Sequence, residues 1–135
     1  MKNRSMPPGP VIPELPYADV PAAARWLCAA FGFTERLRIG THRIQLHVGQ
    51  GSVVVVEAGP GGVAPGSRVM VAVADVDVHY ARAVAAGAQV AGEPTTHPYG
   101  ERQYSATDPG GHRWTFSQSV ADSDPAGWGG ELVAP

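Results

Sequence analysis

The sequence predicts an α+β fold made of two tandem βαβββ modules, and three observations support this fold class. The chain has 135 residues, 44% of them hydrophobic, which is enough for one domain with a substantial core. The same order of predicted elements occurs twice. Matching residues of the two halves also lie at nearly constant separations: 56 residues between Asp19 and Asp75, 55 between Gly32 and Gly87, and 60 between Gly51 and Gly111.

The first module begins with a predicted strand over residues 11–17. Asp19 is a good N-cap for the helix that follows, and Pro21 lies in its first turn, where a missing N–H costs nothing. Apolar residues recur at helical spacing up to Phe31, and Gly32 is placed to end the helix. Three runs rich in β-branched or alternating apolar residues then predict strands over residues 33–39, 42–48 and 52–58.

The second module repeats this order. A strand is predicted over residues 68–73, and a helix over residues 76–86 lies between Asp75 as N-cap and Gly87 as its end. Further strands are predicted over residues 88–91, 102–107 and 113–119, with the extra length of this module in a loop at residues 93–101. We therefore expect one domain over residues 10–120, with modules at 10–60 and 67–120, between tails at 1–9 and 121–135.

Composition excludes several kinds of partner. The formal net charge is −2 and no basic run occurs, so we expect no binding to nucleic acid. The longest apolar runs, residues 26–31 and 69–74, are far shorter than the roughly 20 residues of a membrane-spanning helix, so we expect no membrane partner. No apolar signal segment is recognisable at the N-terminus, which predicts a soluble cytoplasmic protein. Cys28 is the only cysteine, so no intramolecular disulfide can form, and we expect it to be a buried thiol.

Several segments carry a family resemblance. They are the Asp19-Val-Pro helix start, Phe31-Gly32-Phe33, Ala85-Ala-Gly87-Ala, Tyr99-Gly100 and, most specifically, Asp108-Pro-Gly-Gly-His-Arg-Trp114. Together they resemble the vicinal oxygen chelate superfamily, which holds glyoxalases, bleomycin-resistance proteins and extradiol dioxygenases. The resemblance spans most of the chain. It implies a single glyoxalase-like domain in which the two modules form a curled mixed sheet around a cleft, with the helices outside, and it implies a homodimer.

The resemblance also implies four positions for a divalent metal's His and Glu ligands. In this chain those positions hold Ile12, Val55, Arg68 and Thr115, none of which is a usual ligand. We therefore expect no metal and no other cofactor. A displaced metal site built from Glu14, Glu57 and one of His42, His47 or His97 is the alternative.

The candidate ligand-binding residues follow from strand alternation. Glu14 is two residues from Ile12 and Glu57 is two from Val55, so we expect both to share one concave surface with Arg68 and Thr115. His97 and Tyr99 in the inserted loop and Arg102 at the next strand are further candidates. Other ring-bearing residues are interpreted structurally: Trp26, Trp114 and Phe116 as packing residues, His79 as solvated, and His112 as holding its turn.

These observations favour a metal-free protein that binds a small organic molecule in its cleft, as bleomycin-resistance proteins do. The alternative is a lyase, isomerase or dioxygenase of the same superfamily, using a displaced metal or Glu14 or Glu57 as general base. A scaffold without a small ligand is the third hypothesis.

Overall fold

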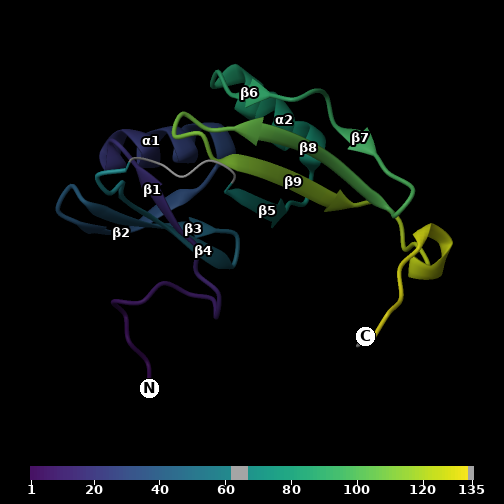
Figure 1. Cartoon of the computed structure of the whole chain (residues 1–135), viewed down its shortest axis with the longest axis horizontal. Helices are drawn as coiled ribbons and strands as arrows, with labels where there is room; N and C mark the ends of the chain where they lie inside the picture. Colours follow the sequence, from purple (N-terminus) through teal and green to yellow (C-terminus); the bar gives the residue numbers. More distant parts are fainter. Residues whose placement is uncertain (62–66, 134–135) are drawn as a thin grey trace.

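The computed structural model describes residues 1–61 and 67–133 and has the predicted α+β class (Figure 1). The elements of the first module are β1 (Glu14–Tyr17), α1 (Val20–Phe31), β2 (Thr34–Ile39), β3 (Arg43–Val48) and β4 (Gly51–Glu57). Those of the second are β5 (Arg68–Ala72), α2 (Val76–Ala85), β6 (Gln89–Val90), β7 (Thr95–Thr96), β8 (Glu101–Thr107) and β9 (Arg113–Ser119). Most of the predicted joint between the modules lies outside the described residues.

Both helices begin where their aspartates predict. The Asp19 side chain accepts a hydrogen bond from the Ala22 N–H at 3.0 Å, and the Asp75 side chain accepts one from the Val78 N–H at 3.1 Å. Helix α1 ends at Gly32, whose φ of 77° places it in the left-handed region that glycine adopts without strain. Helix α2 ends at Ala85, one residue earlier than predicted. The spacing of caps and glycines therefore located both helices.

Each module forms its own mixed sheet. Sheet A has the strand order β1-β4-β3-β2, with β1 parallel to β4. Sheet B has the order β5-β9-β8-β6, with β5 parallel to β9 and the short strand β7 paired to β8. The first strand of each module thus lies beside the last one. Strand β7 lies in the inserted loop, where the sequence indicated no strand.

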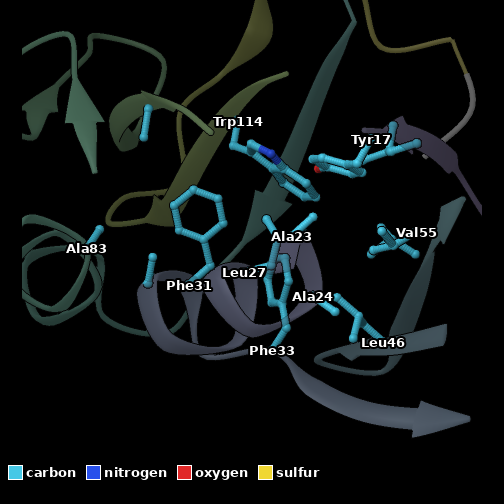
Figure 2. Close-up of a cluster of buried hydrophobic side chains, with 14 of the residues drawn as sticks. Tyr17, Ala23, Ala24, Leu27, Phe31, Phe33, Leu46, Val55, Ala83 and Trp114 are labelled. Carbon is cyan, nitrogen blue, oxygen red and sulfur yellow. The ribbon is translucent and has the colours of Figure 1, made fainter. Parts of the chain in front are cut away.

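One hydrophobic core joins the two modules. The Phe31 ring, at the end of α1, lies 5.6 Å from the Trp114 ring and 4.7 Å from the Phe116 ring of β9. Figure 2 shows Leu46 and Val55 of sheet A projecting into the same cluster as Trp114 of sheet B. Trp114 and Phe116 are fully buried, as expected, and Trp26 packs edge-on against Phe31.

Strand alternation gives each sheet a face that packs on its helix and an opposite face, here called the open face. On sheet A the open face carries Glu14, Arg43, Gln45, Ser52 and Val54. On sheet B it carries Arg68, Met70, Glu101, Gln103, Ser105, Thr115 and Ser117.

Both terminal segments have defined positions. The N-terminal segment contacts the open face of sheet A, with the Pro8 carbonyl accepting a hydrogen bond from the Ser52 hydroxyl at 2.8 Å. The C-terminal segment contains a one-turn 3-10 helix, η1 (Pro125–Trp128), in a stretch for which the sequence predicted no regular element. None of the helices in the described part of the chain is both long and apolar enough to cross a membrane.

Candidate functional site

The open face of sheet B carries a row of polar side chains, most of which are hydrogen-bonded to a neighbour. The register places Thr115 beside Ser105 on β8, and their hydroxyls lie 2.8 Å apart. One position along, Ser117 lies beside Gln103, whose amide nitrogen donates to the Ser117 hydroxyl at 3.0 Å. Because these groups alternate along both strands, they all point to the side away from α2. This face offers both donors and acceptors to a ligand.

The Gln103 and Ser117 side chains are also hydrogen-bonded to Tyr99 and to Glu101, respectively. The Tyr99 hydroxyl donates to the Gln103 amide oxygen at 3.2 Å, and the Ser117 hydroxyl donates to Glu101 Oε1 at 2.6 Å. The hydrogen bonds from Ser117 and Ser119 lower the pKa of Glu101, so its charge is stabilised at neutral pH. The result is a chain of donors that ends on a carboxylate.

Arg68 and Thr115 share this open face, as the strand pattern predicted. On the parallel strand β5, Arg68 pairs with Arg113 and Met70 pairs with Thr115. Met70 is 66% exposed, a high value for a large apolar side chain in the middle of a strand. The polar row is therefore bordered by an arginine and by an exposed thioether that can contact apolar groups.

Sequence reasoning missed Glu101, Gln103, Ser105 and Ser117. The signal was present, because residues two apart along a strand share a face, and counting outward from Thr115 reaches Ser117. The residues of β8 that share this face could be identified only from the pairing of β8 with β9. The sequence does not predict that pairing, because the inserted loop before β8 leaves the start of the strand undefined.

The expectation that Glu14 and Glu57 share one surface is wrong. Glu14 pairs with Val54, whereas Glu57 pairs with Tyr17 on the face that packs on α1. Val55, which we had placed on the cleft side, is likewise buried in the core. The Glu14 carboxylate lies 2.7 Å from the Arg43 guanidinium, and Glu57 is exposed at the end of β4. Since adjacent residues of a strand point to opposite faces, the error of one position moved these side chains apart.

The other three candidates have different environments. His97 and Tyr99 stack on each other with ring centroids 5.0 Å apart, and Trp128 of η1 lies 5.6 Å from Tyr99. Arg102 lies on the opposite face of β8 from Gln103 and forms an ion pair with Asp77 at 2.9 Å. That ion pair connects β8 to the first turn of α2, so Arg102 does not join the polar row.

The histidine interpretations divide. His79 was predicted to be solvated, and this is wrong: its Nδ1 lies 2.5 Å from the Tyr104 hydroxyl and its Nε2 lies 3.0 Å from the Phe31 carbonyl oxygen. The first turn of α2 faces the other module, which buries the imidazole and lowers its pKa. His112 does hold its turn, because it is 1% exposed and contacts Ser67 and the Pro16 carbonyl oxygen.

The described residues do not fit a metal centre. Within residues 1–61 and 67–133, no three side chains of His, Cys, Asp or Glu are placed to hold one ion. The displaced site that used Glu14 with Glu57 is not formed, because these carboxylates lie on opposite faces of sheet A. The polar row itself offers hydroxyl and amide groups and a single carboxylate, a set unlike the imidazole and carboxylate ligands of the superfamily's metal.

The fold and this site define a class of protein. The model of the Glyoxalase/Bleomycin resistance protein/Dioxygenase superfamily matches residues 11–116, and the chain belongs to this superfamily. The resemblance noted from the sequence is therefore confirmed. No curated protein matches the chain.

Three solved structures illustrate the relationship. TioX from Micromonospora sp. ML1 is 38% identical with a TM-score of 0.72, and the match covers 82% of this chain and 98% of TioX. TnmS3, an antibiotic binding protein from Streptomyces sp. CB03234, is 26% identical with a TM-score of 0.67, over 80% of this chain and 93% of TnmS3. Lactoylglutathione lyase from Agrobacterium tumefaciens is 18% identical with a TM-score of 0.67, over 85% and 97%, and shares the fold.

Proposed function

We propose that this protein binds a small organic molecule on the open face of sheet B and does so without a metal. The observation that carries the proposal is the set of polar side chains on this face whose hydroxyl, amide and carboxylate groups are aligned by hydrogen bonds to one another. These bonds run from Tyr99 through Gln103 and Ser117 to Glu101. Groups held in this way can orient a polar ligand with little loss of side-chain freedom.

The chemistry of the face indicates what kind of ligand it accepts. Thr115, Ser105 and Gln103 suit hydroxyl, carbonyl or amide groups of a ligand, and Met70 suits an apolar ring or chain. Glu101 suits an amine or a hydroxyl donor. The similarity to TnmS3, an antibiotic binding protein, supports an antibiotic-like small molecule as the ligand.

An enclosed site needs a second surface. Small-molecule sites bury most of the ligand, and one face of a sheet leaves half of it in water. Two cavities lie beside α1, on the helix side of the molecule, and therefore do not enclose the open face of sheet B. One has a volume of about 510 Å³ and is lined in part by Arg25 and Cys28, and the other has a volume of about 440 Å³ and is lined in part by Tyr17 and Ala22. We infer that a second copy of the chain covers the open face of sheet B, giving a homodimer.

The test begins with a thermal-shift screen of small natural-product-like compounds in the presence of EDTA. A stabilising compound is then titrated against the wild type, Thr115→Val and, as a matched control, Thr34→Val on the exposed end of β2. Loss of one hydrogen bond should weaken binding to Thr115→Val by about 2- to 10-fold and leave Thr34→Val unchanged. Equal affinity for all three chains would remove the site from sheet B.

Two further measurements separate binding from catalysis. Elemental analysis of protein purified without chelator should find no stoichiometric zinc, nickel, iron or manganese. One bound metal per chain would overturn the metal-free part of the proposal. Mass spectrometry of the stabilising compound after incubation with the protein should recover it unchanged, and a product would favour an enzyme instead.

A further inference from the structure

The open face of sheet A is covered by the chain's own N-terminus, here called the strap (residues 4–8). Three backbone carbonyls of the strap accept hydrogen bonds from sheet A: Arg4 from Arg36 at 2.9 Å, Ser5 from Gln45 at 2.9 Å, and Pro8 from Ser52 at 2.8 Å. Figure 1 shows this segment running along the side of sheet A away from α1.

Burial shows which part of this face the strap covers. Gln45 is 4% exposed, Ser52 is 5% exposed and Val54 is 1% exposed, although all three point away from the helix. Pro7, in the middle of the strap, is itself buried. On the open face of sheet B, by contrast, Met70 is 66% exposed. Within the described residues, the strap covers the part of sheet A's open face around Gln45, Ser52 and Val54, whereas Met70 on the open face of sheet B stays exposed.

The donors on sheet A are positioned by the strand geometry. Arg36 lies where the pairing of β2 with β3 shifts register, between Glu35 and Leu37. Its guanidinium also donates to the Gln45 amide oxygen at 2.5 Å, which fixes both side chains. The amide, hydroxyl and guanidinium groups therefore form a set of donors aimed at carbonyl oxygens, with Val54 as apolar floor.

The strap is an addition to the superfamily domain. The family model begins its match at residue 11, after the strap ends. Almost all of TioX, 98% of its length, is matched by only 82% of this chain. The strap contributes no residue to the hydrophobic core that joins the modules, since the buried members of that core lie at Leu15 or later.

We propose that the strap is a resident occupant of a second binding face and that, when it leaves, the face accepts an extended peptide-like molecule. The ligand class follows from the donors, because the present occupant offers a row of backbone carbonyls and a proline ring to them. Only the assumption that ligands bind on open faces rests on the function proposed above. The position of the strap itself can be tested separately.

Trypsin tests whether the strap is seated in solution. In the full-length chain, the Arg4–Ser5 bond lies within the contacts to sheet A, whereas the Lys2–Asn3 bond precedes them. Intact-mass spectrometry should show Arg4–Ser5 cut at least roughly tenfold more slowly than Lys2–Asn3, because cleavage follows the open population. Equal cleavage rates in the wild type would overturn the proposal.

Two proline variants provide the matched comparison. Pro7→Asp places a charge at the buried position, and Pro10→Asp places the same charge at an exposed position outside the strap. Pro7→Asp should raise cleavage at Arg4–Ser5 to the rate at Lys2–Asn3, and Pro10→Asp should leave it slow. Equal effects of the two variants would contradict a seated strap.

The binding face is tested with a dye and a peptide. In the Pro7→Asp chain, anilinonaphthalene sulfonate fluorescence should rise several-fold over the Pro10→Asp chain, and a synthetic peptide of residues 1–10 should reverse the increase. No increase, or an increase that the peptide does not reverse, would show that sheet A is not a binding face. Failure of the function proposed for sheet B would be recognised separately, by titration of Thr115→Val.

Discussion

Asp108 is a buried residue whose carboxylate accepts four hydrogen bonds, one of them from the other module. Its carboxylate accepts hydrogen bonds from the Tyr17 hydroxyl at 2.5 Å, the Trp114 indole at 2.9 Å, and the Gly110 and His112 N–H groups at 2.9 and 3.0 Å. Burial and the nearby Asp108 charge raise the pKa of Tyr17 above its ordinary value, so the phenol keeps the proton that it donates. Tyr17 belongs to β1, and this contact therefore connects the two halves.

Replacing Asp108 by asparagine should lower the free energy of unfolding by about 1.5–3 kcal/mol, because an amide offers one acceptor oxygen and brings N–H groups against donors. Urea unfolding of Asp108→Asn and of Asp122→Asn, an exposed control, provides the measurement. Similar stability of both variants would show that the four contacts contribute little.

His79 is a half-buried base whose neutral form is favoured mainly by its burial. Its Nε2–H donates to the Phe31 carbonyl oxygen, which leaves Nδ1 to accept from the Tyr104 hydroxyl. Burial is the main cause that lowers its pKa below 6.5, and the Arg82 guanidinium adds to it. A proton therefore binds the unfolded chain more readily than the folded one.

Stability should accordingly be retained above pH 6.5 and lost as the pH falls below that value. The free energy of unfolding, measured in urea at pH 7.5 and 5.5, should fall more in the wild type and in the exposed-site control His42→Gln than in His79→Gln. The same fall in His79→Gln as in the wild type would assign the pH dependence to other groups.

Among the elements, the turn between β8 and β9 is packed most tightly against the first module. A Cβ on Gly110 would lie 2.4 Å from Cδ1 of the Tyr17 ring, so no larger residue fits without movement. Gly59 is the opposite case, since a Cβ there would meet nothing within 4 Å. The glycine of this turn is therefore needed for close approach between modules.

Gly110→Ala should lower the free energy of unfolding by about 1–3 kcal/mol through overpacking against Tyr17. Gly59→Ala should change it by less than about 0.5 kcal/mol. Thermal unfolding of both variants measures the difference. If Gly110→Ala were as stable as Gly59→Ala, the Tyr17 ring would be able to move away from the added methyl group at no cost, and this prediction would be wrong.

The elements also show where sequence reasoning succeeds. Asp19, Asp75 and Gly32 act on their own backbone neighbours, so local sequence was enough to locate both helices. Sheet faces depend on pairing between distant strands, and the turns before β4 and β9 differ in length. Because of that difference, the repeat places Val55 at the position equivalent to Thr115, whereas Val54 is the residue on the open face. Glu57, two residues from Val55, was misplaced with it. The strap was interpreted as a tail because its backbone carbonyls, not its side chains, make the contacts.

At the scale of the whole molecule, we expect a dimer. Met70 is exposed on the open face of sheet B, and covering it from water favours association. Sedimentation velocity at micromolar concentration should give a species of twice the 14.1 kDa chain mass. Met70→Glu should shift the equilibrium toward the monomer, and Val78→Glu, at an exposed position of α2, should not. A single 14.1 kDa species in the wild type would contradict this.

The shared core has a consequence for what the repeat is. Phe31 ends the helix of the first module yet contacts the rings of Trp114 and Phe116 in the second. A half-length chain would leave either Phe31 or those two rings facing water, so neither half has a complete interior of its own. The two modules are therefore expected to fold together and not as independent units. Calorimetry should find a single melting transition whose van 't Hoff and calorimetric enthalpies agree. A chimera in which one half comes from a relative should not fold unless the contacting core residues of both halves are exchanged together.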